Sequence, residues 1–407
     1  MAFKLPNDQD LTEEQMTIVS LPTNKNFVIQ GGPGTGKTVM AIHRAGMMPK
    51  NAKVLVLVYN RPLCDFIQTG IDEEYYGNVE VNTISSWLSK FFGGTLHEAV
   101  PMKSPAAFDY DWDEIQDRLT TIGNAAKSKS KAYYHHIIVD ESQDCHPALL
   151  RGLAAISQNI TCFIDPNQKI SATSNTGLAE TLAALCELAP VSLTRNFRNT
   201  KQIRDASVLF WSGKPGEPEP AEAEFDGSKP RMIQCATNSD GFDFDDQTSK
   251  MAAVILNNLQ KEIGVLVNAN ALRTTKKELQ KALGDAIPIQ MHKAQTDEVI
   301  DFGVSGVKIL SHGTMKGLEF DLLLIPGLDY ANKSDRDLPD VCRNRLYVGF
   351  SRPLQELCIF YFNDIASMPR WQRSIVKPIF DHPELFDWEN SASSSTPGGQ
   401  GLLDFLD

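Results

Sequence analysis

The chain has 407 residues, of which 42% are hydrophobic and 22% are charged, and its formal net charge is −12. This is the composition of an ordinary soluble globular protein, and the length allows two or three domains that each have a core. The acidic balance excludes a protein that binds nucleic acid over its whole surface, because such binding needs excess positive charge. Any nucleic acid is therefore expected in a local groove.

The sequence also lacks the features of membrane and secreted proteins. No apolar run approaches the length of a membrane span, and the N-terminus has no basic and apolar secretory signal. The seven cysteines are scattered, odd in number and without a C-x-x-C pair, which favours reduced thiols over disulfides or a zinc site. We therefore expect a cytoplasmic protein.

The first half of the chain alternates helical and strand patterns. Residues 11–20 are typical of a capped amphipathic helix that begins at Thr12, and an apolar-periodic stretch at 39–47 predicts another helix. Apolar runs predict strands at 27–29, 53–59, 79–81, 136–140, 160–165 and 191–194. This alternation indicates a parallel α/β sheet, which places its ligands at the carboxyl ends of the strands.

A second parallel α/β unit is expected from Arg195 onward. Its predicted strands are 231–235, 263–268, 307–310, 322–325 and 357–362, and its predicted helices are about 247–261, 274–284 and 341–351. Residues 212–230 are rich in Pro, Gly and Glu and predict a solvated surface excursion. The predicted domains are 1–194, with a small insert at about 91–131, and 195–388, followed by a flexible tail at 389–407.

One segment has the pattern of a phosphate-binding P-loop. The pattern G-x-x-x-x-G-K-[ST] is filled by Gly31, Gly32, Pro33, Gly34, Thr35, Gly36, Lys37 and Thr38. Glycines let consecutive N–H groups cradle phosphate oxygens, and the following helix points its positive end at the same charge. Lys37 is expected to reach the β- and γ-phosphates, and Thr38 to bind Mg²⁺. The alternative, an ordinary glycine-rich turn, leaves the flanking strand and helix unexplained.

Two adjacent carboxylates follow the predicted strand at 136–140. Hydrolysis of a nucleoside triphosphate needs one group that holds Mg²⁺ and another that orients the attacking water. We assign Asp140 to Mg²⁺ and Glu141 to the role of catalytic base. The alternative is a solvated acidic turn, which the P-loop upstream makes less attractive.

Six segments together resemble one family. The P-loop, 140–144, 165–168, 193–198, 316–320 and 347–352 occur in the order found in UvrD/Rep-like superfamily 1 helicases. The resemblance covers about residues 11–365. It implies two RecA-like P-loop NTPase domains with parallel sheets and ATP in the cleft between them. The predicted insert is short, so no large accessory subdomains are expected.

The resemblance also implies roles for single residues. Gln15 matches the glutamine that bonds adenine, and Gln168 matches the γ-phosphate sensor. Arg198 and Arg352 match two arginines that reach the γ-phosphate from the second domain. Glu319 matches a residue near the ribose and the nucleic-acid strand. Hydrolysis would then depend on closure of the two domains.

Nucleic-acid contacts are predicted on the same basis. The candidates are Tyr59, Asn60, Thr83, Ser85, Trp87 and Lys316. Trp87 has a core position as its alternative, and Lys316 has a solvated position. The stretch after Gln168 has no aromatic residue where translocating members of the family stack on bases, so processive translocation is less strongly indicated.

The end of the chain carries a short motif. Gln400, Leu403 and Phe405 fill Q-x-x-L-x-F and resemble peptides that dock on replication sliding clamps. The alternatives are a disordered terminus and a strip packed on its own domain.

The leading functional hypothesis is an ATP-dependent helicase or translocase on single-stranded DNA, with 3′–5′ polarity and with RNA still open. The second is an ATPase switch or regulatory subunit gated by nucleic acid or by a nuclease or clamp partner. A small-molecule kinase would explain neither Arg352 nor the segment at 316–320.

Overall fold

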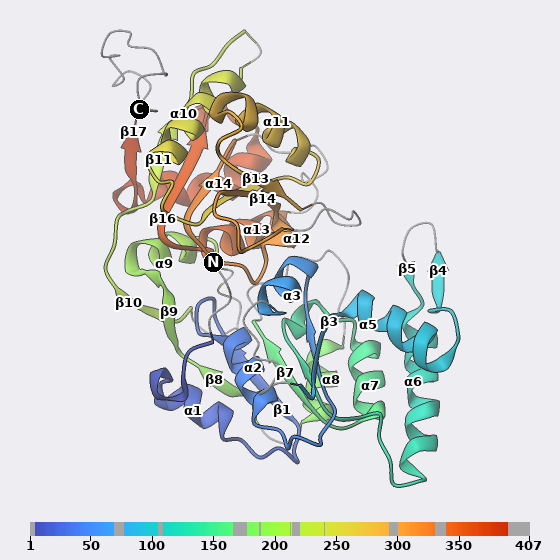
Figure 1. Cartoon of the computed structure of the whole chain (residues 1–407). Helices are drawn as coiled ribbons and strands as arrows, with labels where there is room; N and C mark the ends of the chain where they lie inside the picture. Colours follow the sequence, from blue (N-terminus) through green and yellow to red (C-terminus); the bar gives the residue numbers. More distant parts are fainter. Residues whose placement is uncertain are drawn as a thin grey trace.

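The structure, a computed structural model, contains two parallel β-sheets covered by helices (Figure 1). It describes residues 5–68, 77–104, 109–165, 177–186, 189–211, 213, 220–239, 241–292, 300–329 and 339–389. The predicted α/β class with two RecA-like sheets is confirmed. The first domain is the lower half of the molecule in Figure 1 and the second domain is the upper half.

The first sheet has the strand order β3-β2-β6-β7-β1-β8, and all of its pairings are parallel. Its strands are β1 (Phe27–Gly31), β2 (Val54–Val58), β3 (Val79–Thr83), β6 (Tyr134–Val139), β7 (Ser157–Ile164) and β8 (Val191–Leu193). All five residues of β2 are buried, as expected for a strand with helices on both faces.

Helices cover both faces of the first sheet. They are α1 (Glu13–Val19), α2 (Lys37–Gly46), α3 (Arg61–Gln68), α5 (Ile84–Lys90), α6 (Trp112–Lys127), α7 (Pro147–Ile156) and α8 (Leu178–Leu185), with short helices η1 (Asp8–Asp10) and η4 (Ser142–Asp144). Thr12 begins α1 with a capping box, in which Thr12 accepts from the N–H of Gln15 and Gln15 accepts from the N–H of Thr12.

The predicted insert is ordered around α6. It consists of a π-helical turn η2 (Phe91–Leu96), a hairpin of β4 (Met102–Ser104) and β5 (Asp109–Tyr110), and α6 itself. Glycines let α6 pack closely on α7, because a Cβ at Gly123 would lie 2.3 Å from the carbonyl oxygen of Ala155.

The second sheet has the strand order β13-β14-β12-β15-β16-β11-β17 and is also parallel. Its strands are β11 (Arg231–Gln234), β12 (Ile263–Val267), β13 (Ile289–Met291), β14 (Val307–Ser311), β15 (Phe320–Ile325), β16 (Pro353–Tyr361) and β17 (Asp387–Glu389). Its helices are α9 (Lys201–Val208), α10 (Phe244–Leu256), α11 (Leu272–Leu283), α12 (His312–Met315), α13 (Pro339–Phe350), α14 (Arg370–Asp381), η7 (Ile365–Ser367) and η8 (Pro383–Leu385).

The segment between the two sheets contains a strand where a solvated surface excursion was predicted. β9 (Arg195–Thr200) pairs in parallel with β10 (Glu222–Phe225), which lies inside the segment predicted to be a solvated excursion. The strand was missed because its sequence, EAEF, is mostly polar and short. Arg195 forms an ion pair with Glu224 across this pair of strands.

The two domains pack directly against each other. Leu63 of α3, together with Met315 and Leu318 of the second domain, belongs to one buried hydrophobic cluster. Gly317 has φ +85°, and a Cβ there would lie 2.5 Å from a methyl group of Leu63. The contact between α3 and α12 therefore fixes how the carboxyl ends of the two sheets meet.

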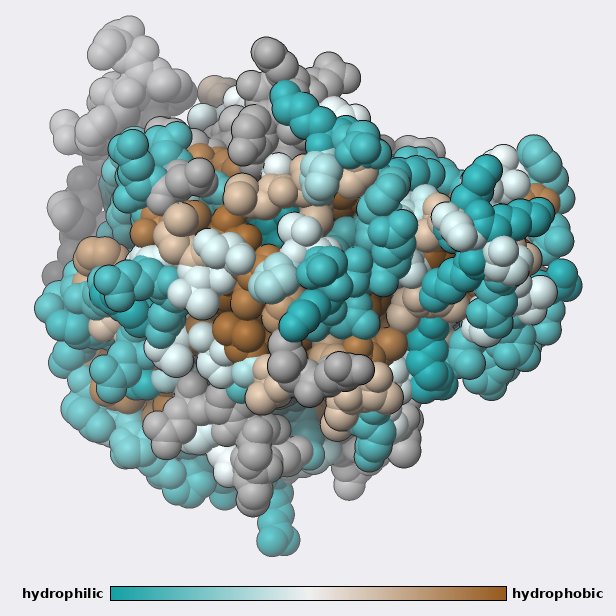
Figure 2. Space-filling model, turned by 90° about the horizontal axis from the view of Figure 1, so that it is seen from below, coloured by the Kyte–Doolittle hydropathy of each residue, from teal (hydrophilic) through white to brown (hydrophobic). Residues whose placement is uncertain are grey.

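The surface carries both hydrophobic and hydrophilic residues. The face seen from below in Figure 2 has hydrophobic residues near its centre and hydrophilic residues around them. Among the described residues, no helix is both long and apolar enough to cross a bilayer. All seven cysteines are free thiols.

Candidate nucleotide site

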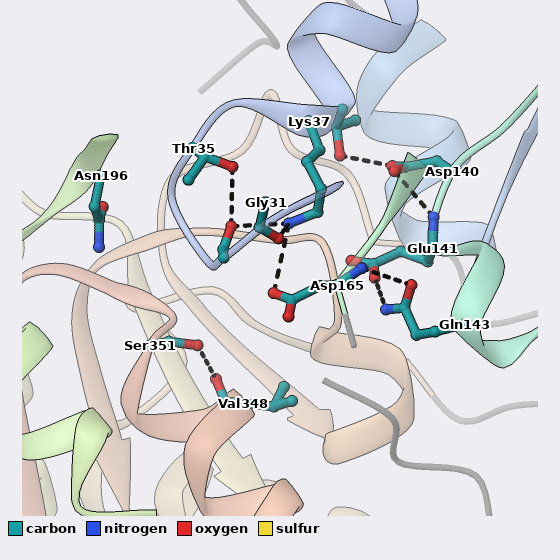
Figure 3. Close-up of polar contacts among 12 residues, drawn as sticks. Gly31, Thr35, Lys37, Asp140, Glu141, Gln143, Asp165, Asn196, Val348 and Ser351 are labelled. Carbon is teal, nitrogen blue, oxygen red and sulfur yellow. Dashed lines mark hydrogen bonds and ion pairs between the residues drawn. The ribbon is translucent and has the colours of Figure 1, made fainter. Parts of the chain in front are cut away.

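The P-loop joins β1 to α2 and wraps around the side chain of Lys37 (Figure 3). Gly34 and Gly36 have φ of 74° and 85°, a conformation that suits glycine. The Nζ atom of Lys37 donates to the carbonyl oxygens of Gly31 and Gly32, at 2.8 Å each. It also lies 3.5 Å from Oδ2 of Asp165, at the end of β7. The loop thus holds a buried ammonium group beside two neighbouring strand ends.

Thr38 and Asp140 meet beside this ammonium group. The hydroxyl of Thr38 donates to Oδ2 of Asp140 at 2.6 Å. Burial and then the charge of Glu141 raise the pKa of Asp140. Within the described residues, no group of three or more His, Cys, Asp or Glu side chains could hold a metal alone. Mg²⁺ commonly takes one or two protein oxygens and completes its shell with phosphate and water, so these two oxygens fit Mg²⁺.

Glu141 follows directly with an unusual backbone conformation. Its φ is 52°, which is uncommon for a residue with a side chain, and its N–H donates to Oδ1 of Asp140 at 3.0 Å. Gln143 donates to the carboxylate of Glu141 and accepts from the N–H of Asp165 at 3.0 Å. Gln143 therefore fixes Glu141 relative to the end of β7.

The charge state of Glu141 depends on both domains. Burial acts to raise the pKa of Glu141, but the charges of Lys316, Lys37 and Arg352 outweigh it and lower the pKa. Glu141 is therefore ionised at neutral pH in spite of its burial.

Lys316 lies inside this cluster, which contradicts the prediction that it contacts nucleic acid. Its side chain is 0% exposed, its Nζ atom is 3.2 Å from Oε2 of Glu141, and it also pairs with Asp144. The ammonium group lies 5.0 Å from the ring centroid of Tyr59. Burial opposes its charge, but Glu141 and Asp144 together raise its pKa. A buried, doubly paired lysine cannot serve as a surface contact for phosphate.

Asn60 joins the two domains. Its side-chain amide donates to the carbonyl oxygens of Gly313 and Lys316, at 3.2 and 2.7 Å. Its oxygen accepts from the N–H of Leu63 at the start of α3. Asn60 therefore holds the segment after β2 against the segment after β14.

Of the remaining predicted nucleic-acid contacts, Thr83 and Trp87 are buried and Ser85 is exposed. Thr83 is buried and begins α5 by accepting from the N–H of Ser86, whereas the neighbouring Ser85 is exposed. Trp87 is 0% exposed and donates to the hydroxyl of Tyr134 at 3.0 Å. Trp87 is therefore a core residue, and the prediction that it contacts nucleic acid is wrong.

The second domain reaches the P-loop through the segment after β8. The N–H of Phe197 donates to the carbonyl oxygen of Gly34 at 2.9 Å. A Cβ at Gly34 would lie 2.0 Å from Oδ1 of Asn196, so only glycine allows this approach. Asn199 donates to the carbonyl oxygens of Ser351 and Pro353, at 3.0 and 2.6 Å. This links the segment on the P-loop to the end of α13.

Both predicted arginines lie at this junction. Arg198 donates to Oε1 of Glu319 at 2.7 Å. Arg352 is 1% exposed and donates to the carbonyl oxygen of Val348 at 3.3 Å. Burial, followed by the charge of Arg198, lowers the pKa of Arg352 to about 10. The structure thus brings Arg198, Arg352 and Glu319 to the P-loop side of the second domain.

Gln15 lies against the P-loop from the other side. Its amide nitrogen donates to the carbonyl oxygen of Thr35 at 3.4 Å. A Cβ at Gly36 would lie 2.9 Å from the same nitrogen. Gln15 is thus held between the start of α1 and the start of α2.

Some predicted residues lie outside the described part of the chain. These are Gln168, Gln400, Leu403 and Phe405. Conversely, sequence reasoning gave no role to three side chains that organise the site, which are Gln143, Asp144 and Asn196. The first two stand next to the predicted carboxylates, and this adjacency was the available signal.

One comparison with a protein-family model concerns the first domain. Residues 15–174 match a family model described as an AAA domain. The first domain has a P-loop fold. The chain is also similar to the crystal structure of the C-terminal domain of a possible DNA helicase from Lactobacillus plantarum WCFS1, with 19% identity over 48% of this chain and 99% of that chain and a TM-score of 0.32. A search of curated proteins gave no match.

Proposed function

We propose that this protein is an ATP-dependent translocase or helicase that acts on single-stranded DNA with 3′–5′ polarity. The observation that carries the proposal is the meeting of charged side chains from both domains beside the P-loop. Lys37 and Thr38 lie on the first domain, and Arg352 lies on the second with its guanidinium buried. The order of the six sequence segments, which resembles UvrD/Rep-like helicases, and the AAA-domain match support this reading. The polarity rests on the resemblance alone.

The side chains around the P-loop suit hydrolysis of ATP. The loop N–H groups and Lys37 would bind the phosphates, and Thr38 and Asp140 would hold Mg²⁺, which neutralises phosphate charge when bound. Glu141, kept ionised by its cationic neighbours, would orient the attacking water and accept its proton.

Residues of the second domain would complete the site. Arg198 and Arg352 would stabilise charge on the transferring phosphoryl group. Glu319 holds Arg198, so its role would include positioning that arginine as well as contacting the ribose. Gln15, beside the start of α2, is suited to contact the base. Gln168 is proposed as the γ-phosphate sensor on the resemblance alone.

The nucleic acid would cross the carboxyl edge of the first sheet. Tyr59 and Asn60 follow β2, while Thr83 ends β3 and Ser85 lies just beyond it. Ser85 is exposed, Tyr59 and Asn60 are half-buried and Thr83 is buried, so Ser85 is the most accessible of these contacts. The tail residues Gln400, Leu403 and Phe405 would bind a protein partner such as a sliding clamp.

A second function has its own support. Asn60 and Lys316 connect the predicted strand-binding segment to Glu141 through contacts between the domains. Such a connection also suits an ATPase switch in which closure changes binding to a nuclease or clamp partner without unwinding.

ATP hydrolysis measured with single- and double-stranded DNA and RNA tests the proposal. We expect single-stranded DNA to stimulate the rate, and Lys37→Ala and Glu141→Gln to abolish it. Absence of stimulation by every nucleic acid would contradict the proposed motor. Stimulated hydrolysis without strand displacement, measured on a partial duplex, would favour the switch.

A further inference from the structure

Helix α11 (Leu272–Leu283) presents a row of positive side chains on the second domain. Arg273, Lys277 and Lys281 are four residues apart and share one face of the helix, and Lys276 lies three residues after Arg273 beside that face. These four residues line one open hollow together with Gln280, Gly284, Asp285 and Met291. Arg273, Lys277 and Lys281 are exposed, and Lys276 is half-buried. We call these four residues the basic stripe.

The basic stripe carries positive charges that no acidic side chain of the described residues pairs with. Lys308, on the neighbouring strand β14, is buried and forms an ion pair with Glu262 at 2.6 Å. Within the described residues, no member of the stripe forms an ion pair or a side-chain hydrogen bond. The chain as a whole carries a charge of −12. Four such cations on one helix form a local positive surface in a chain of net negative charge, and the field of that surface attracts a polyanion.

Two acidic residues, Glu278 and Asp285, lie near the basic stripe, but neither forms an ion pair with its positive side chains. Glu278 is on the same helix but lines a different hollow, together with Thr274 and Thr275. Asp285 lies at the far end of the stripe, where the amide of Gln280 approaches it at 3.5 Å. Lys281 lies eight residues after Arg273, or about 12 Å along the helix. Three or four phosphates of a duplex strand occupy that length.

The stripe also begins near the proposed path of the nucleic acid. α11 packs on β13 and β14, at the opposite edge of the sheet from β17 (Figure 1). Arg273 follows the carboxyl end of β12 by only a few residues, and β14 ends at the same sheet edge in α12, which contacts α3. A strand that crosses this edge next to Asn60 can therefore continue along α11.

We propose that the basic stripe binds the phosphate backbone of the nucleic acid on which this protein acts, away from the proposed nucleotide site. The inference rests on the proposed function, and it adds a surface that sequence reasoning did not single out. Because the contacts are to phosphate, the stripe gives affinity and direction of entry without selecting a base sequence.

The test compares two triple variants with the same loss of charge. One variant combines Lys276→Ala, Lys277→Ala and Lys281→Ala in the stripe. The control combines Lys127→Ala, Lys129→Ala and Lys131→Ala at the end of α6, where all three lysines are exposed. Binding of a fluorescent oligo-dT and of a blunt DNA duplex is measured from 50 to 300 mM salt, on protein whose thermal melting has been checked.

We expect the stripe variant to bind oligo-dT on the order of 100-fold more weakly at 0.1 M salt. The slope of log K against log salt should become less steep by about 2, because each lost phosphate contact reduces the steepness by about 0.7 for a single strand. The control variant should keep the wild-type slope. A triple Lys→Arg variant of the stripe should also keep it, because it preserves the charge. If the stripe variant loses affinity only for the duplex, the stripe binds duplex DNA rather than the single strand.

Other results overturn the inference. If the stripe variant binds both DNAs with the wild-type slope, the stripe is a solvated face, while the proposed function stands. The single Lys277→Glu variant is a second check that does not depend on the folding of the triple variant. If it also leaves the slope unchanged, the stripe does not contact phosphate. If the wild type binds no nucleic acid but binds poly-glutamate through the stripe, the partner is an acidic protein, and both proposals fail.

Discussion

The ammonium group of Lys316, from the second domain, lies 3.2 Å from the carboxylate of Glu141, from the first. Both side chains are buried, and Asp144 closes the other side of the cluster. The residue proposed as catalytic base is therefore held by a charge that reaches it only when the two domains are together. Four consequences of the structure can be measured.

Lys316→Met should lower kcat for ATP hydrolysis with little change in KM. The variant leaves Glu141 and Asp144 buried without their cation, a change that typically costs about 3–5 kcal/mol of folding free energy. Lys308→Met is the matched control, because Lys308 is also buried and paired, but with Glu262, outside the site. Steady-state kinetics and urea unfolding of both variants separate the effects. Equal losses of kcat in the two variants would contradict a specific role for Lys316.

Gly34→Ala should abolish hydrolysis by separating the second domain from the P-loop. A Cβ at Gly34 would lie 2.0 Å from Oδ1 of Asn196, in addition to the strain of its positive φ. Gly241→Ala is the control, since Gly241 has φ +87° but no atom of the described residues within 4 Å of the added Cβ. The control should cost about 1 kcal/mol of stability and keep the ATPase rate. Partial recovery in the double variant Gly34→Ala, Asn196→Ala would identify the clash as the cause.

His136 should make the protein less stable in mild acid. It is 1% exposed, it lies 2.8 Å from the hydroxyl of Thr161, and burial, followed by the charge of Arg44, lowers its pKa to about 3. The unfolded chain binds a proton near pH 6.5, whereas the folded protein does so only near pH 3. The stability is therefore complete above pH 6.5 and is lost as the pH falls toward 3.

The expected loss from His136 is about 2 kcal/mol between pH 7 and pH 5. Urea unfolding at each pH measures it, and His136→Asn should flatten the dependence by that amount. His97→Asn serves as the control, because His97 is exposed and asparagine tolerates its positive φ of 56°. A dependence of equal steepness in the wild type and His136→Asn would contradict this prediction.

The sequence predicted those features that depend on local pattern. The P-loop and strands such as β2 follow from glycine spacing and from continuous apolar runs. Features that depend on contacts between distant segments were missed. Lys316 carries no local sign that it is buried against Glu141, 175 residues earlier by subtraction of their numbers. Trp87 of helix α5 packs inward, where Tyr134 of strand β6 supplies the partner for its indole N–H.

Asn60→Ala should weaken the contact between the domains more than the fold of either domain. The side-chain amide of Asn60 donates to two carbonyl oxygens of the second domain, those of Gly313 and Lys316. Asn78→Ala is a close control, because its amide also donates to two carbonyl oxygens, those of Pro49 and Ala52, but within the first domain. Asn78→Ala loses these two hydrogen bonds, whereas Asn60→Ala also loses the one that its oxygen accepts from the N–H of Leu63. Each bond is worth about 0.5–1.5 kcal/mol.

The two asparagine variants should therefore differ more in activity than in stability. For Asn60→Ala we expect a lower kcat for ATP hydrolysis, because Lys316 and Arg352 are then held less firmly against the first domain. Asn78→Ala should lose slightly less stability, by about one hydrogen bond, and keep its kcat. Urea unfolding and ATPase assays on the same preparations measure both quantities. If Asn78→Ala loses as much kcat as Asn60→Ala, the effect comes from general destabilisation, and the contact between the domains does not control hydrolysis.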